Sequence, residues 1–330
     1  MKPEVPFSEK LADGQAQCHL CPHSCRIKPD GRGLCRVRKN VGGELRALNY
    51  GEVSAIALDP IEKKPLYHFY PGRAILSVGT MGCNLSCGFC QNYHIAQEVP
   101  PTRYVTPEEL AELAAEAKDR GSIGIAYTYS EPLMWYEYLM ATAPIIKDHD
   151  LKNVLVTNGY INQEPMARLL PYIDAMNIDL KSFTEDFYHK NCKGRLEPVK
   201  QTIETCAGQT HIEITTLIIP GENDQPQEID ELASWIAGLS PEIPLHLSRY
   251  HPAYKFYQPP TPVETMELVR QAARVHLKNV YVGNIVGFDN STYCSNCAEL
   301  LVMRSGYQVK RTNNYSHECK KCGQSQAFVD

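Results

Sequence analysis

The sequence predicts an α/β fold built on a parallel β-sheet, with a small cysteine-rich segment at each end of the chain. Short apolar runs with the length of buried strands alternate with amphipathic segments that have the length of helices. Such repeated strand–helix units predict parallel strands joined by right-handed crossovers. The candidate strands span residues 74–78, 123–129, 153–157, 175–181, 211–219, 245–249 and 279–282.

The composition limits the class of protein. At 330 residues the chain can form one large domain with small appendages. A net charge of −5 does not favour nucleic acid, and no apolar stretch is long enough to span a membrane, so neither partner is expected. The 13 cysteines are closely spaced and no signal peptide precedes them, which indicates metal sites and predicts a cytoplasmic location.

The first 40 residues contain a cysteine quartet, Cys18, Cys21, Cys25 and Cys35. This segment is too short to form an apolar core of its own, and a bound metal can replace such a core. We expect a structural zinc ion, because four thiolates complete a tetrahedral shell. An auxiliary iron–sulfur cluster is the alternative, and two nearby histidines can substitute for a cysteine ligand. Residues 41–70 follow as a linker, in which Pro60 and Pro65 bound a charged run and predict a rigid extended segment.

A second group of cysteines, Cys83, Cys87 and Cys90, follows the first candidate strand. Three thiolates cannot complete the four-coordinate shell of a structural zinc ion. They can bind three irons of a cubane iron–sulfur cluster and leave the fourth iron open. Gly82 and Gly88 allow the backbone to pass close to such a cluster.

This cysteine loop resembles that of the radical S-adenosylmethionine (SAM) enzymes, in which the open iron of a [4Fe–4S] cluster binds the methionine end of SAM. Residues 59–69, 79–85 and 90–92 resemble the AmmeMemoRadiSam-system family of these enzymes. That family is related to the enzymes that activate glycyl-radical enzymes such as pyruvate formate-lyase. The resemblance covers nearly the whole chain and implies an incomplete (β/α)6-type radical SAM barrel, with the cysteines at the C-terminal ends of its strands.

The resemblance also implies the residues that hold SAM. Residues 129–132 stand in place of the family's Gly-Gly-Glu-Pro motif, and here Ser130 and Glu131 precede the proline. Glu131 and nearby carbonyl groups are expected to accept hydrogen bonds from the methionyl ammonium group. Asn158, after the next strand, is expected to bind the carboxylate or the ribose of SAM.

Two further strand ends carry candidate ligands of SAM. Asp179 and Lys181 match the Asp-x-Lys motif of the activating enzymes. Lys181 is expected to pair with the SAM carboxylate, and Asp179 with a hydroxyl group or a bound cation. His251 resembles a strand-end histidine that lies near the ribose in those relatives. Phe89, between two of the cysteines, either shields the cluster or adenine or simply packs within its loop.

The helices between the strands have recognisable boundaries. Thr106 and Glu109 form a capping box, Pro107 suits the first helical position, and Gly121 follows the end of the first helix. A second helix is expected over residues 133–146, ended or kinked near Pro144. Further helices are expected near residues 197–206, 228–237 and 262–276.

The C-terminal segment carries the third cysteine group, Cys294, Cys297, Cys319 and Cys322. Two Cys-x2-Cys pairs on either side of a short hairpin predict a zinc ribbon, and an auxiliary cluster is the alternative. Cys192 and Cys206 are expected to be inert thiols. The chain is thus expected to comprise a cysteine-rich N-terminal segment (1–70), a partial barrel (71–287) and a ribbon (288–330).

The predicted function is reductive cleavage of SAM to a 5′-deoxyadenosyl radical that abstracts hydrogen from a substrate, as in an activating-enzyme-like oxidoreductase. The relationship implies an electron donor such as flavodoxin or ferredoxin and a protein substrate, with a small molecule or lipid as the alternative. An inactive metal-binding scaffold is the competing class. A tRNA-modifying enzyme is a third, suggested by the basic residues of the tail, Arg304, Lys310, Arg311, Lys320 and Lys321.

Overall fold

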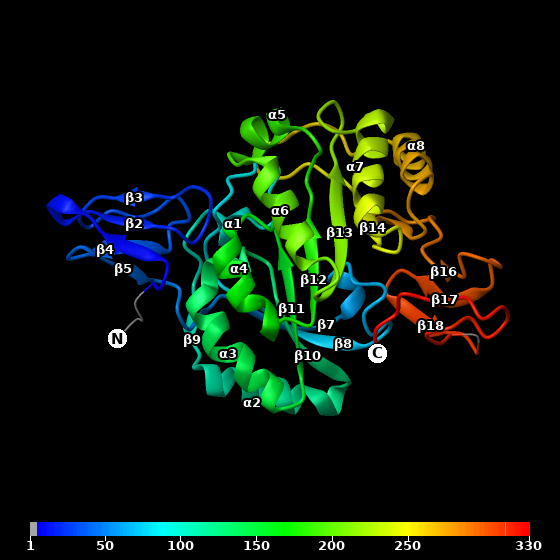
Figure 1. Cartoon of the computed structure of the whole chain (residues 1–330), viewed down its shortest axis with the longest axis horizontal. Coiled ribbons are helices and arrows are strands. Elements are labelled where there is room, and N and C mark those ends of the chain that lie inside the picture. Colours follow the sequence, from blue (N-terminus) through cyan, green and yellow to red (C-terminus); the bar gives the residue numbers. More distant parts are fainter. Residues whose placement is uncertain (1–4, 314) are drawn as a thin grey trace.

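The computed structural model describes residues 5–313 and 315–330, and its centre is a sheet with the strand order β15-β14-β13-β12-β11-β10-β8-β7 (Figure 1). Strands β8 to β15 are parallel, and β7 is antiparallel to β8. The sheet is partly open, because β7 and β15 lie at its two ends. The strands are β7 (Ala55–Pro60), β8 (Ala74–Gly79), β10 (Ser122–Tyr127), β11 (Lys152–Thr157), β12 (Ala175–Asp179), β13 (His211–Ile218), β14 (Leu245–Arg249) and β15 (Val280–Gly283).

All seven predicted strands are confirmed in the sheet, whereas β7 was not predicted. β7 lies at the sheet edge and pairs with β8 along its whole length, from Ala55 opposite Gly79 to Pro60 opposite Ala74. Most of its side chains are only partly buried, and Ile56 is 41% exposed. Its apolar run covers only residues 55–58 and is followed by Asp59 and Pro60. Proline is tolerated in it because an edge strand has one unpaired side.

The charged run after β7 is not extended, so that expectation is wrong. Ile61–Lys63 forms a turn of 3₁₀-helix that buries Ile61 and Glu62. Glu62 accepts a hydrogen bond from the Gly72 backbone N–H at 2.7 Å, and Lys64 pairs with Asp59 at 2.9 Å. Each buried charge thus has a partner, which allows the run to turn inward rather than face the solvent.

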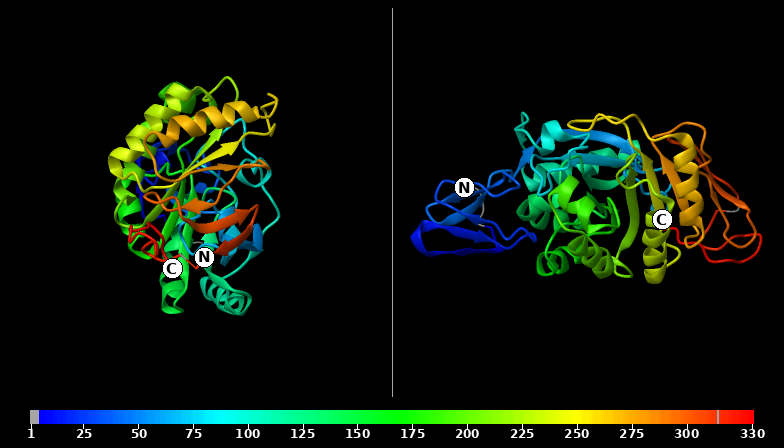
Figure 2. Two further views of the ribbon diagram at one scale, coloured as in Figure 1. Left: turned by 90° about the vertical axis from the view of Figure 1, so that its right-hand side faces the viewer. Right: turned by 90° about the horizontal axis from the view of Figure 1, so that it is seen from above.

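The helices cover the outside of the sheet (Figures 1 and 2). The predicted capping box is confirmed: the Thr106 hydroxyl accepts from the Glu109 N–H at 3.1 Å, and the Glu109 carboxylate accepts from the Thr106 N–H at 2.7 Å. The helices are α1 (Tyr93–Ala96), α2 (Pro107–Ala117), α3 (Tyr136–Asp148), α4 (Gln163–Leu169), α5 (Glu185–Phe187), α6 (Leu196–Cys206), α7 (Pro226–Leu239) and α8 (Val263–Arg274). No helix among the described residues has the length and hydropathy needed to cross a membrane.

Helix α3 continues past Pro144 to Asp148, so the helix does not end at that proline, and a kink there stays a prediction. Leu139, Ala143 and Ile146 are fully buried on either side of this position. Their burial on both sides of the proline outweighs the one helical hydrogen bond that the proline removes.

The cysteine-rich segments lie at opposite ends of the long axis of the molecule (Figures 1 and 2). The N-terminal segment contains a three-stranded sheet and a hairpin, and a small strand pair joins it to the region after α1. The C-terminal segment is a three-stranded antiparallel sheet. The strands are β1 (Ser8–Lys10), β2 (Ala16–Cys18), β3 (Arg26–Ile27), β4 (Arg38–Val41), β5 (Glu44–Ala47), β6 (Glu52–Val53), β9 (Arg103–Tyr104), β16 (Thr292–Tyr293), β17 (Leu300–Ser305) and β18 (Gln308–Arg311).

A buried carboxylate ties the segment after β7 to the start of β13. Glu213 accepts hydrogen bonds from the backbone N–H groups of Tyr67 at 2.9 Å and His68 at 2.7 Å. The same carboxylate contacts His246 Nε2 at 2.6 Å and His211 Nε2 at 3.0 Å. This carboxylate network therefore fixes the connection between β7 and β8 against the base of the sheet.

Because of this network, we expect the free energy of unfolding to decrease as the pH is lowered from about 6.5 toward 3. Burial lowers the pKa of His68 to about 3, so only the unfolded chain binds a proton there over most of this range. Burial alone would raise the pKa of Glu213, but hydrogen bonds from His211 and His246 hold it well below its usual value. Denaturant unfolding at a series of pH values measures the effect, and equal stability at pH 7 and pH 4 would contradict it.

Candidate active site and metal centres

A cavity of about 250 Å³ lies at the C-terminal ends of the parallel strands. Its wall is built by residues that end or follow β8, β10, β11, β12, β13 and β14. Polar groups from many strands meet there because parallel strands end at one edge of a sheet. The cavity brings together most of the site residues expected from the sequence, namely Cys83, Cys87, Cys90, Ser130, Glu131, Asn158, Asp179 and Lys181.

The cysteine loop is held by hydrogen bonds from several elements. The Leu85 N–H and the Asn158 side-chain amide approach the Cys83 sulfur at 3.4 and 3.6 Å. The Ser86 N–H donates to the carbonyl oxygen of Cys192 at 2.9 Å. Donors that point at a cysteine sulfur stabilise its thiolate form and tune a bound iron–sulfur cluster.

The donor set of this loop fits a [4Fe–4S] cluster with one open iron. Three thiols line the cavity, and its other lining residues, as far as the chain is described, include no fourth cysteine and no histidine. Among the described residues, these three sulfurs lie too far apart to bind a single metal ion together. A cluster whose ligands bind separate irons suits this wider arrangement. Phe89 lines the cavity and also packs against Phe187 and Phe256, so both expected roles are compatible with its position.

Glu131 is buried at the start of the turn after β10. Its carboxylate accepts hydrogen bonds from the Thr157 hydroxyl at 2.6 Å, the Asn158 N–H at 2.8 Å and the Leu133 N–H at 3.0 Å. Burial raises the pKa of Glu131 to about 7 despite these hydrogen bonds. An ammonium group in the cavity would favour the ionised carboxylate.

The residue at the first glycine position of the family motif is Tyr129, and it adopts a φ of 70°. Glycine adopts this left-handed conformation easily, whereas a tyrosine is strained in it. The Tyr129 hydroxyl donates to Asp59 at 2.9 Å, and the Lys64 ammonium lies 4.8 Å from the centre of its ring. These contacts offset the strain. The turn therefore keeps its conformation even though a tyrosine replaces the glycine of the motif. The neighbouring Ser130 hydroxyl is buried and has no partner within the described residues.

Asp179 and Lys181 form an ion pair on one wall of the cavity, with 2.7 Å between Oδ2 and Nζ. Burial alone would lower the pKa of Lys181, but Asp179 raises it well above its usual value. Lys181 is therefore a permanent cation at the mouth of the site. Its backbone is fixed as well, because its N–H donates to the Tyr188 hydroxyl and its carbonyl oxygen accepts from Asn223.

His251 does not line the cavity. It is exposed, and its Nε2 lies 3.2 Å from the carbonyl oxygen of Asn284. Asn284 itself and Ser248, which sequence reasoning missed, do line the cavity and share a hydrogen bond of 2.8 Å. Their positions at strand ends were the available signal, but a serine and an asparagine carry no motif.

Cys192 is also closer to the site than expected. Its thiol lies within hydrogen-bonding reach of Cys87. Cys206 is buried in α6 away from the cavity lining. The sequence could not separate these two cysteines, because neither belongs to a spaced group.

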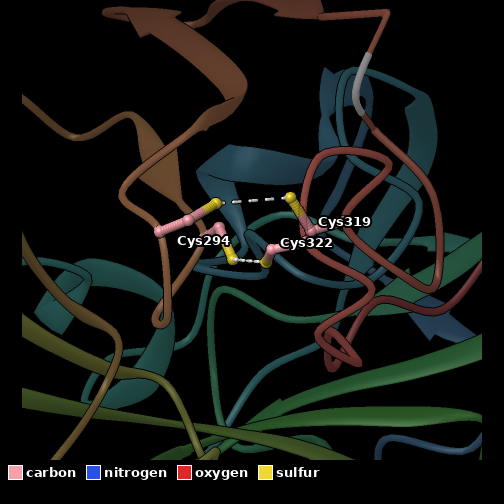
Figure 3. A group of neighbouring side chains, drawn as sticks. Cys294, Cys319 and Cys322 are labelled. Atoms are coloured by element: carbon pink, nitrogen blue, oxygen red, sulfur yellow. Dashed lines mark hydrogen bonds between the residues drawn. The ribbon is translucent and has the colours of Figure 1, made fainter.

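The C-terminal quartet has the geometry of a single-ion site. The four sulfurs lie within 4.8 Å of one another (Figure 3). Cys294 and Cys322 approach to 3.6 Å, and Cys297 and Cys319 to 3.7 Å. Tetrahedral zinc with Zn–S bonds of about 2.3 Å places its sulfurs about 3.8 Å apart. The spacing therefore fits one tetrahedral ion.

We expect that replacing Cys319 and Cys322 with serine unfolds the C-terminal segment locally and leaves SAM cleavage largely intact. The described core of this segment is small, so the bound ion supplies much of its folding free energy. None of the four cysteines lines the cavity at the strand ends. Hydrogen exchange of residues 290–330, together with a SAM-cleavage assay, measures both effects. Loss of cleavage with an intact barrel would show that the segment serves the active site.

The N-terminal quartet is arranged differently. Its four cysteines line a second, smaller cavity between the N-terminal strands and the barrel. Within the described part of the chain, however, these thiols are not gathered as closely as those of the C-terminal quartet. The two quartets therefore differ in the spacing of their thiols.

Comparison with known proteins identifies the family. A model of the radical SAM superfamily matches residues 77–236, which include the cysteine loop. The chain is 44% identical to the uncharacterized protein MJ0808 of Methanocaldococcus jannaschii, over 97% of this chain and 98% of that protein. It is 26% identical to a probable GTP 3′,8-cyclase of Methanosarcina mazei, over 68% of this chain and 72% of that protein.

Among solved structures, a radical SAM methyltransferase from Sphaerobacter thermophilus shares the fold, with a TM-score of 0.53 and 19% identity over 91% of this chain and 81% of that chain. SuiB of Streptococcus suis, bound to S-adenosylmethionine, gives a TM-score of 0.52 at 14% identity over 64% of this chain and 52% of that chain. The family match, the fold and the cysteine-lined cavity at its strand ends lead to one conclusion. The chain belongs to the radical SAM superfamily and is an enzyme.

Proposed function

We propose that the protein cleaves SAM reductively at a [4Fe–4S] cluster held by Cys83, Cys87 and Cys90. One observation carries the proposal: three thiols share a cavity with a buried carboxylate and a permanent cation. These are the charges needed to hold the amino and carboxylate groups of SAM beside an open iron. When bound, the cluster would supply the electron that breaks the bond between the sulfonium sulfur and the 5′-carbon of SAM, giving methionine and a 5′-deoxyadenosyl radical that takes a hydrogen atom from a substrate.

The residues of the cavity position SAM. Glu131 accepts from the ammonium group of SAM, and the free hydroxyl of Ser130 offers a further hydrogen bond beside it. Lys181 pairs with the SAM carboxylate in competition with Asp179. Asn158 orients the cluster loop, because its amide reaches both Cys83 and the Asn84 side chain. The buried wall excludes water from these groups.

We infer that the enzyme belongs to the AmmeMemoRadiSam-system family and acts on a protein, as the activating enzymes do. The resemblance of residues 59–69 and of the Asp-x-Lys motif supports this assignment. A flavodoxin or ferredoxin would supply the electron, and zinc would occupy the C-terminal quartet. A small-molecule substrate is the second candidate, favoured by the similarity to a probable GTP 3′,8-cyclase over two thirds of the chain.

The experiment is anaerobic reconstitution with iron and sulfide, followed by an assay for 5′-deoxyadenosine after reduction with dithionite. Lys181→Ala is expected to weaken SAM binding by about 1 to 3 kcal/mol, because a charge-assisted hydrogen bond is lost. Lys190→Ala is the control, since this exposed lysine pairs with Glu222 and does not line the cavity. Equal SAM affinity of the two variants would show that Lys181 does not bind SAM. Absence of 5′-deoxyadenosine from the wild-type reaction would contradict the proposed reaction.

A further inference from the structure

We propose that the N-terminal quartet binds a second [4Fe–4S] cluster rather than a zinc ion. Cys18, Cys21, Cys25 and Cys35 supply all four ligands, so this cluster has no open iron. The assignment reverses the preference for zinc that the sequence alone suggested. It rests on the spacing of the thiols, the apolar wall around them and a buried cation that faces them.

The C-terminal quartet provides an internal standard for spacing. Its four thiols lie at single-ion distances, within 4.8 Å of one another. The N-terminal thiols surround one cavity, yet among the described residues they do not reach that spacing. A cluster binds each cysteine through a different iron and encloses sulfide at its centre, so its ligands stand farther apart than those of one zinc ion.

The wall of the cavity suits a sulfide-rich core. Apart from the thiols, Gly33, His23 and one arginine, it consists of Leu20, Ile27, Leu34 and Met134. Leu20, Ile27 and Met134 are buried and Leu34 is exposed, so the wall limits the access of water to a cluster on all sides except that of Leu34.

Arg38 supplies the observation that points to an anionic occupant. Its side chain is 1% exposed and lines the cavity, and one guanidinium nitrogen pairs with Glu137 at 2.9 Å. Its Nε and Nη1 have no hydrogen-bond partner among the described residues. Buried N–H groups of a cation are costly without acceptors. A cluster with four thiolates is an anion, and its sulfur atoms can accept these hydrogen bonds.

The second cluster would lie against the loop of the first. His23 Nε2 lies 2.8 Å from the carbonyl oxygen of Asn84, the residue after Cys83. A Cβ atom on Gly82 would lie 2.8 Å from the carbonyl oxygen of Cys35, so only glycine allows this approach. A ligand of the second cluster thus packs directly on the residue that precedes the first ligand of the catalytic cluster.

The test uses the full chain with the catalytic cysteines replaced, Cys83→Ala, Cys87→Ala and Cys90→Ala, after anaerobic reconstitution. This variant should retain about four irons and four sulfides per chain, against about eight of each in the wild type. Electron paramagnetic resonance after dithionite reduction should show one remaining iron–sulfur signal. Further replacement of Cys18 and Cys21 with serine should remove both the iron and the signal.

Zinc analysis completes the test. About one zinc per chain is expected, and it should disappear with Cys319→Ser and Cys322→Ser but not with the N-terminal changes. Two zincs per chain, with no iron in the variant that lacks the catalytic cysteines, would overturn the proposal. Because this variant leaves the N-terminal quartet untouched, the result does not depend on whether the N-terminal changes unfold their segment. SAM cleavage by the wild type is measured separately, so failure of one proposal leaves the other standing.

Discussion

Replacing Cys83, Cys87 and Cys90 together with alanine is expected to abolish SAM cleavage while the barrel stays folded. These three thiols are the cysteines of the cavity wall, whose other described residues include no histidine, and the neighbouring Cys192 cannot hold a cluster by itself. The barrel should stay folded, because most of its core is formed by apolar residues of the strands and helices, and alanine keeps an apolar side chain at the three loop positions that contact this core. Anaerobic measurement of 5′-deoxyadenosine reports cleavage, and circular dichroism reports the fold.

The control for this prediction is Cys206→Ala. Cys206 is fully buried in α6 and does not line the cavity. Its replacement removes one sulfur and leaves a small void, which is expected to reduce stability modestly and leave cleavage unchanged. If the triple variant still produced 5′-deoxyadenosine, the cysteine loop would not be the site of SAM cleavage.

Glu213→Ala is expected to lower the free energy of unfolding by about 3 to 5 kcal/mol. The substitution leaves two buried backbone N–H groups, those of Tyr67 and His68, without their acceptor. It also removes the partner of His211 and His246, and it opens a cavity at a position that is completely buried. Glu213→Gln should cost less, because the amide oxygen can still accept some of these hydrogen bonds.

Glu164→Ala is the matched control, because it removes an exposed glutamate instead of the buried Glu213. Glu164 pairs with Arg168 on the surface of α4, where both side chains are largely exposed. An exposed ion pair of this kind contributes about 0.5 kcal/mol or less. Denaturant unfolding of the three variants compares them directly, and a similar small loss for Glu213→Ala and Glu164→Ala would show that the buried network is not structural.

The parts of the fold that follow from local rules were predictable from sequence. Buried parallel strands are short apolar runs, and the boundary of α2 follows from Thr106, Glu109 and Pro107, whose capping geometry is local. The edge strand β7 was missed, because its short apolar run at residues 55–58 ends in Asp59 and Pro60 and its place in the sheet depends on pairing with β8. The inward turn at Glu62 and Lys64 likewise depends on partners, since a charged run looks solvated until its partners are known.

The candidate site shows the same division. Cysteines at fixed spacing and the polar residues at strand ends were predictable, and topology then brings those strand ends together. Ser248, Asn284 and Cys192 were missed because their roles depend on which residues meet in space. The spacing of thiols in the two quartets could not be read from the chain, since sequence gives the number of ligands but not the width of the space between them.

The order of strands in the sheet has a consequence for how the protein is made. From β7 to β15 each strand lies beside its predecessor in the sheet, apart from the small strand β9, so most contacts join neighbouring parts of the chain. Folding can therefore proceed by adding one strand at a time as the polypeptide leaves the ribosome. The cysteine loop emerges after the second of these strands, whereas Asn284, on the far wall of the cavity, follows the last. During synthesis the three thiols are thus exposed before the wall that finally encloses them exists.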